Sequence, residues 1–84
     1  MTYEVEFSKS AQKEFKKIDP TIRLRIGKAI HALGSDPRNG NVRPMVGTKS
    51  WRLRVGEYRV VYDISDQKLT VLIIKVKHRR EVYR

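Results

Sequence analysis

The 84-residue chain contains no cysteine and only two histidines, and both shortages restrict the chemistry open to it. Without cysteine there is no disulfide framework, no thiol nucleophile and no zinc finger. A metal site would have to be built from carboxylates, but the nine acidic residues are scattered along the sequence. We therefore expect a protein that uses neither a metal ion nor another cofactor.

Long apolar runs are also missing from the sequence. The longest aliphatic stretch, Val-Leu-Ile-Ile at residues 71–74, is far too short to cross a bilayer. The first residues carry an acidic side chain and no apolar segment, so no secretory signal is visible. We expect a cytoplasmic protein without a membrane partner. A chain of 84 residues can bury one thin core, so we expect a single domain over residues 1–84.

Acidic residues are outnumbered by basic ones. Nineteen lysines and arginines against nine acidic residues give a formal net charge of +10. The chain can still fold, because 39% of its residues are hydrophobic, unlike those of a disordered basic tail. A compact cationic domain indicates a polyanionic partner: nucleic acid first, an acidic protein second and a membrane surface third.

The first half of the sequence predicts a strand and two helices. Residues 2–7 alternate between apolar and polar side chains, as in a half-buried strand. Ser8 is a suitable N-cap for the first helix. Asp19 followed by Pro20 predicts the start of a second helix, which should stop at Gly34. Two helices joined this tightly should form an antiparallel hairpin on a sheet. The lysines of the first helix are expected to be solvated or to make auxiliary contacts: Lys9, Lys13, Lys16 and Lys17.

The second half predicts a long loop and then strands. Residues 34–50 are rich in Gly, Pro, Asn and Ser, with room for a short extended piece around residues 42–46. Alternation resumes at residue 51, residues 56–57 suit a hairpin loop, and the last strand covers about residues 69–77. The predicted order is β-α-α-β-β-β. This is an α+β fold in which a helical hairpin packs on a small, mainly antiparallel sheet.

The predicted hairpin places arginines against each other. Counting outward from a loop at Gly56 and Glu57 puts all apolar residues on one face and Arg54 directly across from Arg59 on the other. Arg52 follows on the same face. Like charges directly opposite are destabilising, whereas guanidinium groups grip phosphate bidentately and keep their charge. Three arginines on one face therefore predict a phosphate site; the alternative is that they are surface arginines splayed apart into water.

The final strand should bring further basic residues to the same end of the sheet: Lys75, Lys77, His78, Arg79 and Arg80. Strict counting places Lys75 on the core side, so either a bulge intervenes or the strand outruns the core. Parity leaves open whether His78 or Arg79 points into the basic groove. A solvated strand end is the alternative interpretation of this run.

Two segments resemble the RelE branch of the RelE/ParE toxin superfamily: Trp-Arg-Leu-Arg-Val-Gly-Glu-Tyr-Arg-Val-Val-Tyr at 51–62 and His-Arg-Arg-Glu-Val-Tyr at 78–83. The first strand, the helices and the length also fit, so the resemblance covers essentially the whole chain. It implies a RelE-like microbial RNase fold and the toxin of a type II toxin–antitoxin system. Such toxins enter the ribosomal A site and cut mRNA without a metal. The 2′-OH attacks the adjacent phosphate and leaves a 2′,3′-cyclic phosphate and a 5′-OH.

The resemblance also implies roles for individual residues. Arg59 matches the arginine that stabilises the phosphate, Arg79 the late catalytic arginine and Tyr83 the tyrosine that stacks on the substrate. Arg52 and Arg54 match two basic strand residues that are lysines in the best-known members. We expect Arg54 and Arg59 to hold the scissile phosphate. The residues expected to guide the RNA backbone are Arg52, Lys75, Lys77 and Arg80.

Arginine in place of lysine matters for proton transfer. Lysine can be desolvated and act as a base, whereas arginine stays protonated in proteins. Arg52 and Arg54 can therefore stabilise a pentavalent transition state but are poor proton acceptors. His78 has a suitable pKa and is the expected proton carrier, with Tyr83 and Glu57 as weaker choices.

The implied partners are the ribosome with its mRNA and a cognate antitoxin, whose acidic or amphipathic segment wraps the toxin and covers the basic face. DNA would be contacted only indirectly, through the antitoxin complex. Two alternatives stay open. One is a ParE-like toxin that poisons DNA gyrase with the same fold, and the other is a non-catalytic module that binds nucleic acid through its basic face.

Overall fold

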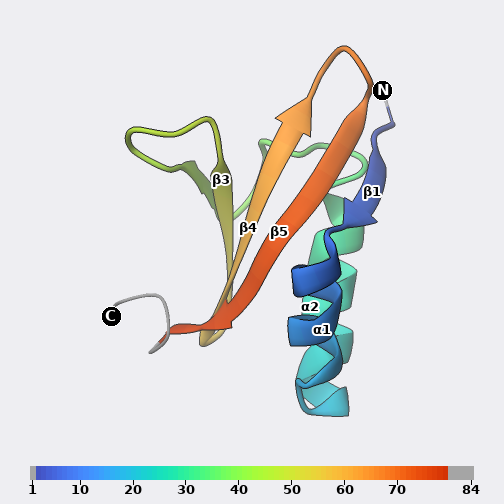
Figure 1. Cartoon of the computed structure of the whole chain (residues 1–84), viewed down its shortest axis with the longest axis vertical. Helices are drawn as coiled ribbons and strands as arrows, with labels where there is room; N and C mark the ends of the chain where they lie inside the picture. The colour runs from blue at the N-terminus through green and yellow to red at the C-terminus, as the bar shows by residue number, and fades with distance from the viewer. Residues whose placement is uncertain (1, 80–84) are drawn as a thin grey trace.

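The computed structural model of the chain describes residues 2–79. Its elements, in chain order, are β1 (Glu4–Phe7), α1 (Lys9–Lys16), α2 (Pro20–Ala32), β2 (Val42–Pro44), β3 (Trp51–Val55), β4 (Tyr58–Ser65) and β5 (Thr70–His78). The strands form one sheet in the order β1-β5-β4-β3-β2, in which only the β1–β5 pair is parallel among the described residues. Helix α1 packs against β5 and β1, α2 packs against β3, and both helices lie on the same side of the sheet (Figure 1). The α+β fold is confirmed, with β2 as a short strand inside the predicted loop.

Side-chain caps start both helices where the sequence predicts them. The Ser8 hydroxyl accepts a hydrogen bond from the backbone N–H of Ala11 at 3.1 Å. The Asp19 carboxylate accepts one from the backbone N–H of Thr21 at 3.2 Å. Each cap satisfies an N–H group that has no carbonyl partner in the first turn of its helix.

Gly34 follows the end of α2, but it is not the left-handed glycine that commonly terminates a helix. The helix itself ends at Ala32, and Gly34 does not adopt a left-handed conformation. Instead the backbone N–H of Tyr3 donates to the Gly34 carbonyl at 2.6 Å. A Cβ atom on residue 34 would lie 3.0 Å from the Tyr3 carbonyl oxygen, so glycine permits this close approach of two backbone segments.

The β3–β4 hairpin has the register that the sequence predicts. Arg54 pairs with Arg59, and the loop between the strands is residues 56–57. Gly56 has a φ of +56°, in the left-handed region where glycine has no Cβ penalty. Leu53 and Val60 occupy the opposite face and are buried in the core. The arginine face of the hairpin therefore points away from the core.

A bulge in β5 decides which way its basic residues face. Between Val61 and Tyr62 of β4, the pairing with β5 jumps from Lys75 to Ile73, which leaves Ile74 as an extra residue. The bulge shifts the alternation by one position. As a result Lys75 is exposed on the side of the arginines and does not point into the core.

The core lies between the helices and the sheet, and Tyr62 is its largest fully buried side chain. The Tyr62 hydroxyl donates to the Pro37 carbonyl oxygen at 2.6 Å, and burial raises the pKa of the phenol to about 12. The other buried core residues are Ala11, Ile18, Ile26, Ile30, Leu33, Leu53, Val60, Val71, Ile73 and Val76. Neither helix in residues 2–79 is long and apolar enough to cross a membrane.

Tyr62 should make folding sensitive to alkaline pH. Its pKa is near 10.0 in an unfolded chain and about 12 in the folded protein. Between these values the unfolded state releases a proton that the folded state keeps, so the free energy of unfolding should fall as pH rises. Tyr62→Phe should flatten this decline in urea unfolding curves, while the lost hydrogen bond costs about 1 kcal/mol at neutral pH. An equally steep alkaline decline in the variant would contradict this origin.

Candidate functional site

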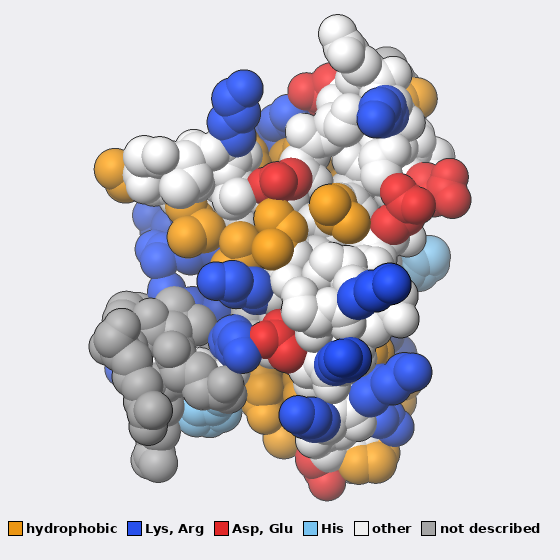
Figure 2. Space-filling view, viewed as in Figure 1, with side chains coloured by type: hydrophobic (Ala, Val, Ile, Leu, Met, Phe, Trp, Pro, Cys, Tyr) orange, Lys and Arg blue, Asp and Glu red, His pale blue; other side chains and the backbone are white. Residues whose placement is uncertain are grey.

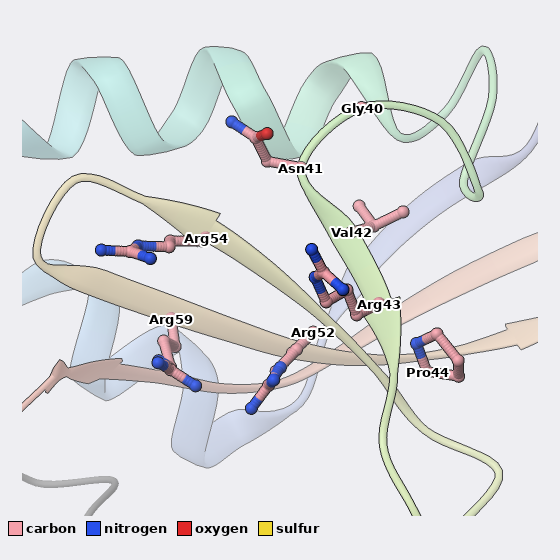
Figure 3. Close-up of a pocket in the computed structure, with 8 residues that line it drawn as sticks. All are labelled: Gly40, Asn41, Val42, Arg43, Pro44, Arg52, Arg54 and Arg59. Carbon is pink, nitrogen blue, oxygen red and sulfur yellow. The ribbon is translucent and has the colours of Figure 1, made fainter.

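An open groove of about 660 Å³ lies on the sheet face that points away from the core. One wall is β2 with the loop before it, and the other is formed by β3 and β4 (Figure 3). The residues that line the groove are Gly40, Asn41, Val42, Arg43, Pro44, Arg52, Arg54 and Arg59. Half of these eight residues are arginines, so the groove is a cationic site.

Strand register places the four arginines as two facing pairs. Arg54 is paired with Arg59 across the β3–β4 hairpin, and Arg43 is paired with Arg52 between β2 and β3. Directly opposed residues of antiparallel strands have Cβ atoms about 5 Å apart. The four guanidinium groups therefore belong to one contiguous patch, as Figure 3 shows.

Arg43 is the member of this patch that the sequence analysis missed. It lies in a strand of only three residues, Val42–Pro44. The loop between β2 and β3 has no two-residue turn from which a register can be counted, so alternation alone does not place Arg43 opposite Arg52. The extended piece predicted around residues 42–46 was the only available signal.

No carboxylate compensates the charges of three of these arginines. Among residues 2–79, Arg43, Arg52 and Arg54 form no ion pair. Arg43 and Arg54 are exposed, and Arg52 is half-buried. Closely spaced like charges repel one another unless an anion lies between them. A phosphate, which accepts two parallel hydrogen bonds from a guanidinium group, is well matched to this arrangement.

The lining residues supply charge but no group that exchanges a proton near neutral pH. The eight residues include no carboxylate and no imidazole, and arginine stays protonated in proteins. Within residues 2–79 no group of three or more His, Asp or Glu side chains is arranged to hold a metal ion. The groove can therefore bind phosphate and stabilise negative charge, but none of its lining side chains in the described part of the chain accepts a proton near neutral pH.

Lys77 lies on the same sheet face as the arginines, but its ammonium group is paired with a carboxylate of helix α1. It is paired with Arg59 in the sheet register, and its ammonium forms an ion pair with Glu14 of α1. The other Glu14 carboxylate oxygen accepts a hydrogen bond from the backbone N–H of Val76 at 2.8 Å. Glu14 thus covers the open edge of β5. Lys77 is brought to the arginine row, as expected, but with its charge already compensated, whereas Lys75 is exposed on the same face.

Glu14→Ala should lower the free energy of unfolding by about 1–2 kcal/mol, because it leaves the partly buried Val76 N–H without an acceptor. Glu14→Gln keeps an acceptor for that N–H and should retain most of the stability. Urea unfolding of the two variants beside the parent measures the difference. Equal stability of the alanine variant and the parent would show that the edge contact is dispensable.

His78 does not reach the arginine groove. It pairs with Tyr58, and the two rings meet edge to face at 87° with centroids 5.2 Å apart. Tyr58 and Arg59 are neighbours in β4, so their side chains point to opposite faces of the sheet. The imidazole therefore lies on the face opposite the arginines, and this position argues against the expectation that His78 carries the proton.

Arg79 lies beside the hairpin loop. Its backbone N–H donates to the Glu57 carbonyl oxygen at 2.6 Å, and its guanidinium is 4.0 Å from the Glu57 carboxylate. Neither Arg79 nor Glu57 lines the groove. Arg80 and Tyr83, the other expected contacts, fall outside the described residues.

Arg38 anchors the loop that leads to the groove wall. Its guanidinium donates two hydrogen bonds to the Asp66 carboxylate, at 3.2 and 2.8 Å, and lies 5.8 Å from the centre of the Trp51 ring. The Tyr3 hydroxyl donates to the same carboxylate at 2.6 Å. The hydrogen bonds from Arg38 and then from Tyr3 lower the pKa of Asp66. These contacts, which join residues far apart in the sequence, hold the loop against the β4–β5 turn.

Basic side chains also occur away from the groove. Figure 2 shows Lys and Arg side chains over the helices as well as beside β3. The lysines on α1 (Lys9, Lys13 and Lys16) are exposed, and none of them lines the groove. Only part of the net charge is therefore concentrated on the groove face.

Comparison with known proteins shows which family this chain belongs to. The family described as ParE toxin of type II toxin-antitoxin system, parDE, matches residues 5–83. The mRNA interferase toxin RelE of Escherichia coli strain K12 is 33% identical over 87 residues, which cover 99% of this chain and 92% of that protein. Toxin RelG of Mycobacterium tuberculosis is 36% identical over 88 residues, covering 100% of this chain and 99% of that protein.

Solved structures agree with these sequence relatives. A RelBE toxin–antitoxin complex of Mycobacterium tuberculosis matches with a TM-score of 0.85 and 29% identity, covering 94% of this chain and 93% of that chain. An archaeal RelE–RelB complex from Pyrococcus horikoshii matches with a TM-score of 0.81 and 27% identity, covering 94% and 97%. The intact Escherichia coli RelBE complex matches with a TM-score of 0.80 and 28% identity, covering 90% and 95%. The chain therefore belongs to the RelE/ParE family, the toxins of type II toxin–antitoxin systems.

Proposed function

We propose that this toxin is an endoribonuclease that cuts mRNA on translating ribosomes. The observation that carries the proposal is the groove in which two facing arginine pairs surround space suited to a phosphate. A relative that is 33% identical and matches nearly the whole chain is named an mRNA interferase toxin, which supports the same substrate.

In the proposed reaction the RNA supplies its own nucleophile. The 2′-oxygen forms a bond to the adjacent phosphorus, the bond from phosphorus to the 5′-oxygen breaks, and the products are a 2′,3′-cyclic phosphate and a 5′-OH. The 2′-OH loses one proton to solvent hydroxide, and the departing 5′-oxygen takes one from a water molecule, which regenerates the hydroxide. Negative charge grows on the non-bridging phosphate oxygens, where fixed guanidinium groups stabilise it. No metal ion takes part in this scheme.

The residues divide the work by position. Arg54 and Arg59, the pair on the β3–β4 hairpin, hold the scissile phosphate, while Arg43 and Arg52 contact the neighbouring phosphate. Arg79 stabilises charge on the leaving oxygen. The further contacts in the proposal are Lys75 and Arg80 on the RNA backbone and Tyr83 stacked on a base.

An antitoxin has to silence such a groove, and we propose that the cognate antitoxin does so with acidic side chains over the arginines. The solved relatives from Mycobacterium tuberculosis and Pyrococcus horikoshii are toxin–antitoxin complexes. Charge complementarity gives such a partner fast association and specificity. Since translating ribosomes are cytoplasmic, the proposal also places the toxin in the cytoplasm.

Primer extension on a message translated in an extract, with and without the protein, tests this function. The expected result is a set of new 5′ ends that follow the reading frame and vanish when translation is blocked. An intact message together with inhibited DNA gyrase would instead support the ParE-like activity that the name of the matched family raises. Salt-dependent RNA binding without any cut would reduce the protein to a binding module.

A further inference from the structure

Among residues 2–79, the wall of the groove that faces β3 and β4 offers a single neutral hydrogen-bonding side chain. Of the eight lining residues, four are arginines, three are Gly40, Val42 and Pro44, and the remaining one is Asn41. Glycine, valine and proline have no polar side-chain atom. Of the side chains that residues 2–79 contribute to the groove, Asn41 is therefore the one that can offer a bound base both an uncharged donor and an acceptor.

The backbone of Asn41 is fixed, whereas its side chain is unused. The backbone N–H of Arg54 donates to the Asn41 carbonyl oxygen at 3.1 Å. The exposed Asn41 amide forms no hydrogen bond with any of residues 2–79. Asn39, two residues earlier, is different, because its side-chain oxygen accepts from the backbone N–H of Gly40 at 2.9 Å. The structure therefore uses one amide to hold the turn and leaves the other available to a ligand.

The position of Asn41 suits contact with a base. Figure 3 shows its amide at the rim of the groove, at the end where Arg54 lies. Gly40 beside it has a φ of +92° and open space on its Cβ side, so no side chain screens the amide from that direction. A phosphate held by Arg54 has the base of its own nucleotide only one ribose away, within reach of this rim.

We propose that Asn41 reads the base next to the scissile phosphate and selects adenine; this inference rests on the proposed nuclease function. A primary amide presents one donor and one acceptor side by side. On its Hoogsteen edge adenine offers the matching acceptor and donor, N7 and N6–H, whereas guanine presents two acceptors there and each pyrimidine only one polar group, so it is this edge of adenine that the amide selects. Sequence-specific RNA recognition reads such edges on unpaired bases. A well-formed bidentate contact of this kind corresponds to a preference of about fivefold or more.

Two substitutions of Asn41 should change the base preference of cleavage in different ways. Asn41→Ala removes both hydrogen bonds, so the adenine preference should fall towards one. Asn41→Asp presents two acceptors, which match the two adjacent N–H donors on the Watson–Crick edge of guanine, so the preference should move to guanine. Asn39→Asp is the matched control, because it adds the same charge nearby and keeps an acceptor for the Gly40 N–H.

The experiment uses messages with one randomised codon, translated by purified ribosomes and cut by the parent protein and the three variants, with all cut ends sequenced. The parent and Asn39→Asp should cut beside adenine about fivefold or more above other bases. Asn41→Ala should lose this preference, and Asn41→Asp should cut preferentially beside guanine. An unchanged adenine preference in folded Asn41→Ala would overturn the inference, as would a complete loss of cutting, which would place Asn41 in the reaction itself. A parent protein that cuts no message at all would overturn the proposed nuclease function and this inference with it.

Discussion

Arg59→Ala should slow mRNA cleavage on translating ribosomes by about 100-fold or more, the usual cost of removing one preorganised donor to a charged transition state. Arg59 faces Arg54 across the hairpin, and in the proposed reaction the two guanidinium groups act on the same phosphate. Arg59 lies on the sheet face that points away from the core, so the variant should still fold. Single-turnover cleavage and thermal unfolding of the same preparation measure the two effects separately.

Arg25→Ala is the matched control for this prediction. Arg25 is an exposed arginine of α2 that does not line the groove, so its loss removes the same unit of charge elsewhere. We expect nearly full cleavage from this variant and a loss similar to that of Arg59→Ala from Arg54→Ala. Full activity of a folded Arg59→Ala protein would contradict the assignment of the phosphate site.

The cleavage step should also accelerate by about tenfold for each pH unit across the neutral range, because no lining residue within 2–79 accepts the proton of the 2′-OH. The charged groups that residues 2–79 contribute to the groove are all arginines, and His78 lies on the other face of the sheet against Tyr58. Hydroxide is then the effective base, and the rate of the chemical step follows its concentration. The measurement is single-turnover cleavage of ribosome-bound message at saturating protein, at a series of pH values.

His78→Ala provides the internal check on this pH profile. The variant should keep both the slope and most of the rate, since the imidazole is not brought to the arginines. A plateau near pH 6.5 that disappears in His78→Ala would restore histidine as the proton carrier. A plateau that disappears in Tyr83→Phe would give this role to the tyrosine, and either result would contradict the hydroxide mechanism.

Local sequence was sufficient to predict the hairpin that carries the site. Gly56 marks the loop, and unbroken alternation on both sides of it leaves one register that buries Leu53 and Val60 together. The helix caps Ser8 and Asp19 were predictable for the same reason, because each acts within its own turn. Such features depend on residues that are neighbours in the chain.

Contacts between residues far apart in the chain could not be predicted from local sequence patterns. The parallel pairing of β1 with β5 joins the two ends of the described chain and leaves no local pattern. Glu14 covers the edge of β5 across more than sixty residues of sequence, which is why the compensated charge of Lys77 was not foreseen. Arg43 was missed because its short strand takes its register from β3 rather than from a turn.

The facing of the last strand shows how one extra residue limits parity arguments. Alternation put Lys75 on the core side, and the bulge at Ile74 reverses that placement. The same irregularity places His78 opposite Tyr58, on the core side of the sheet and not on the face that carries the arginines. Sequence therefore indicated that a bulge was one way to accommodate Lys75, but only the structure shows which residue it contains and what it does to the proton-transfer hypothesis.

A message with a single 2′-deoxynucleotide on the 5′ side of a strong cut tests whether the RNA supplies its own nucleophile. If the arginine groove promotes attack by the RNA's own 2′-OH, cleavage at that one bond should disappear while cuts at other codons of the same message persist. The persisting cuts should end in a 2′,3′-cyclic phosphate on one side and a 5′-OH on the other. Continued cleavage at the deoxy position would show that water is the nucleophile and would contradict this account of the groove.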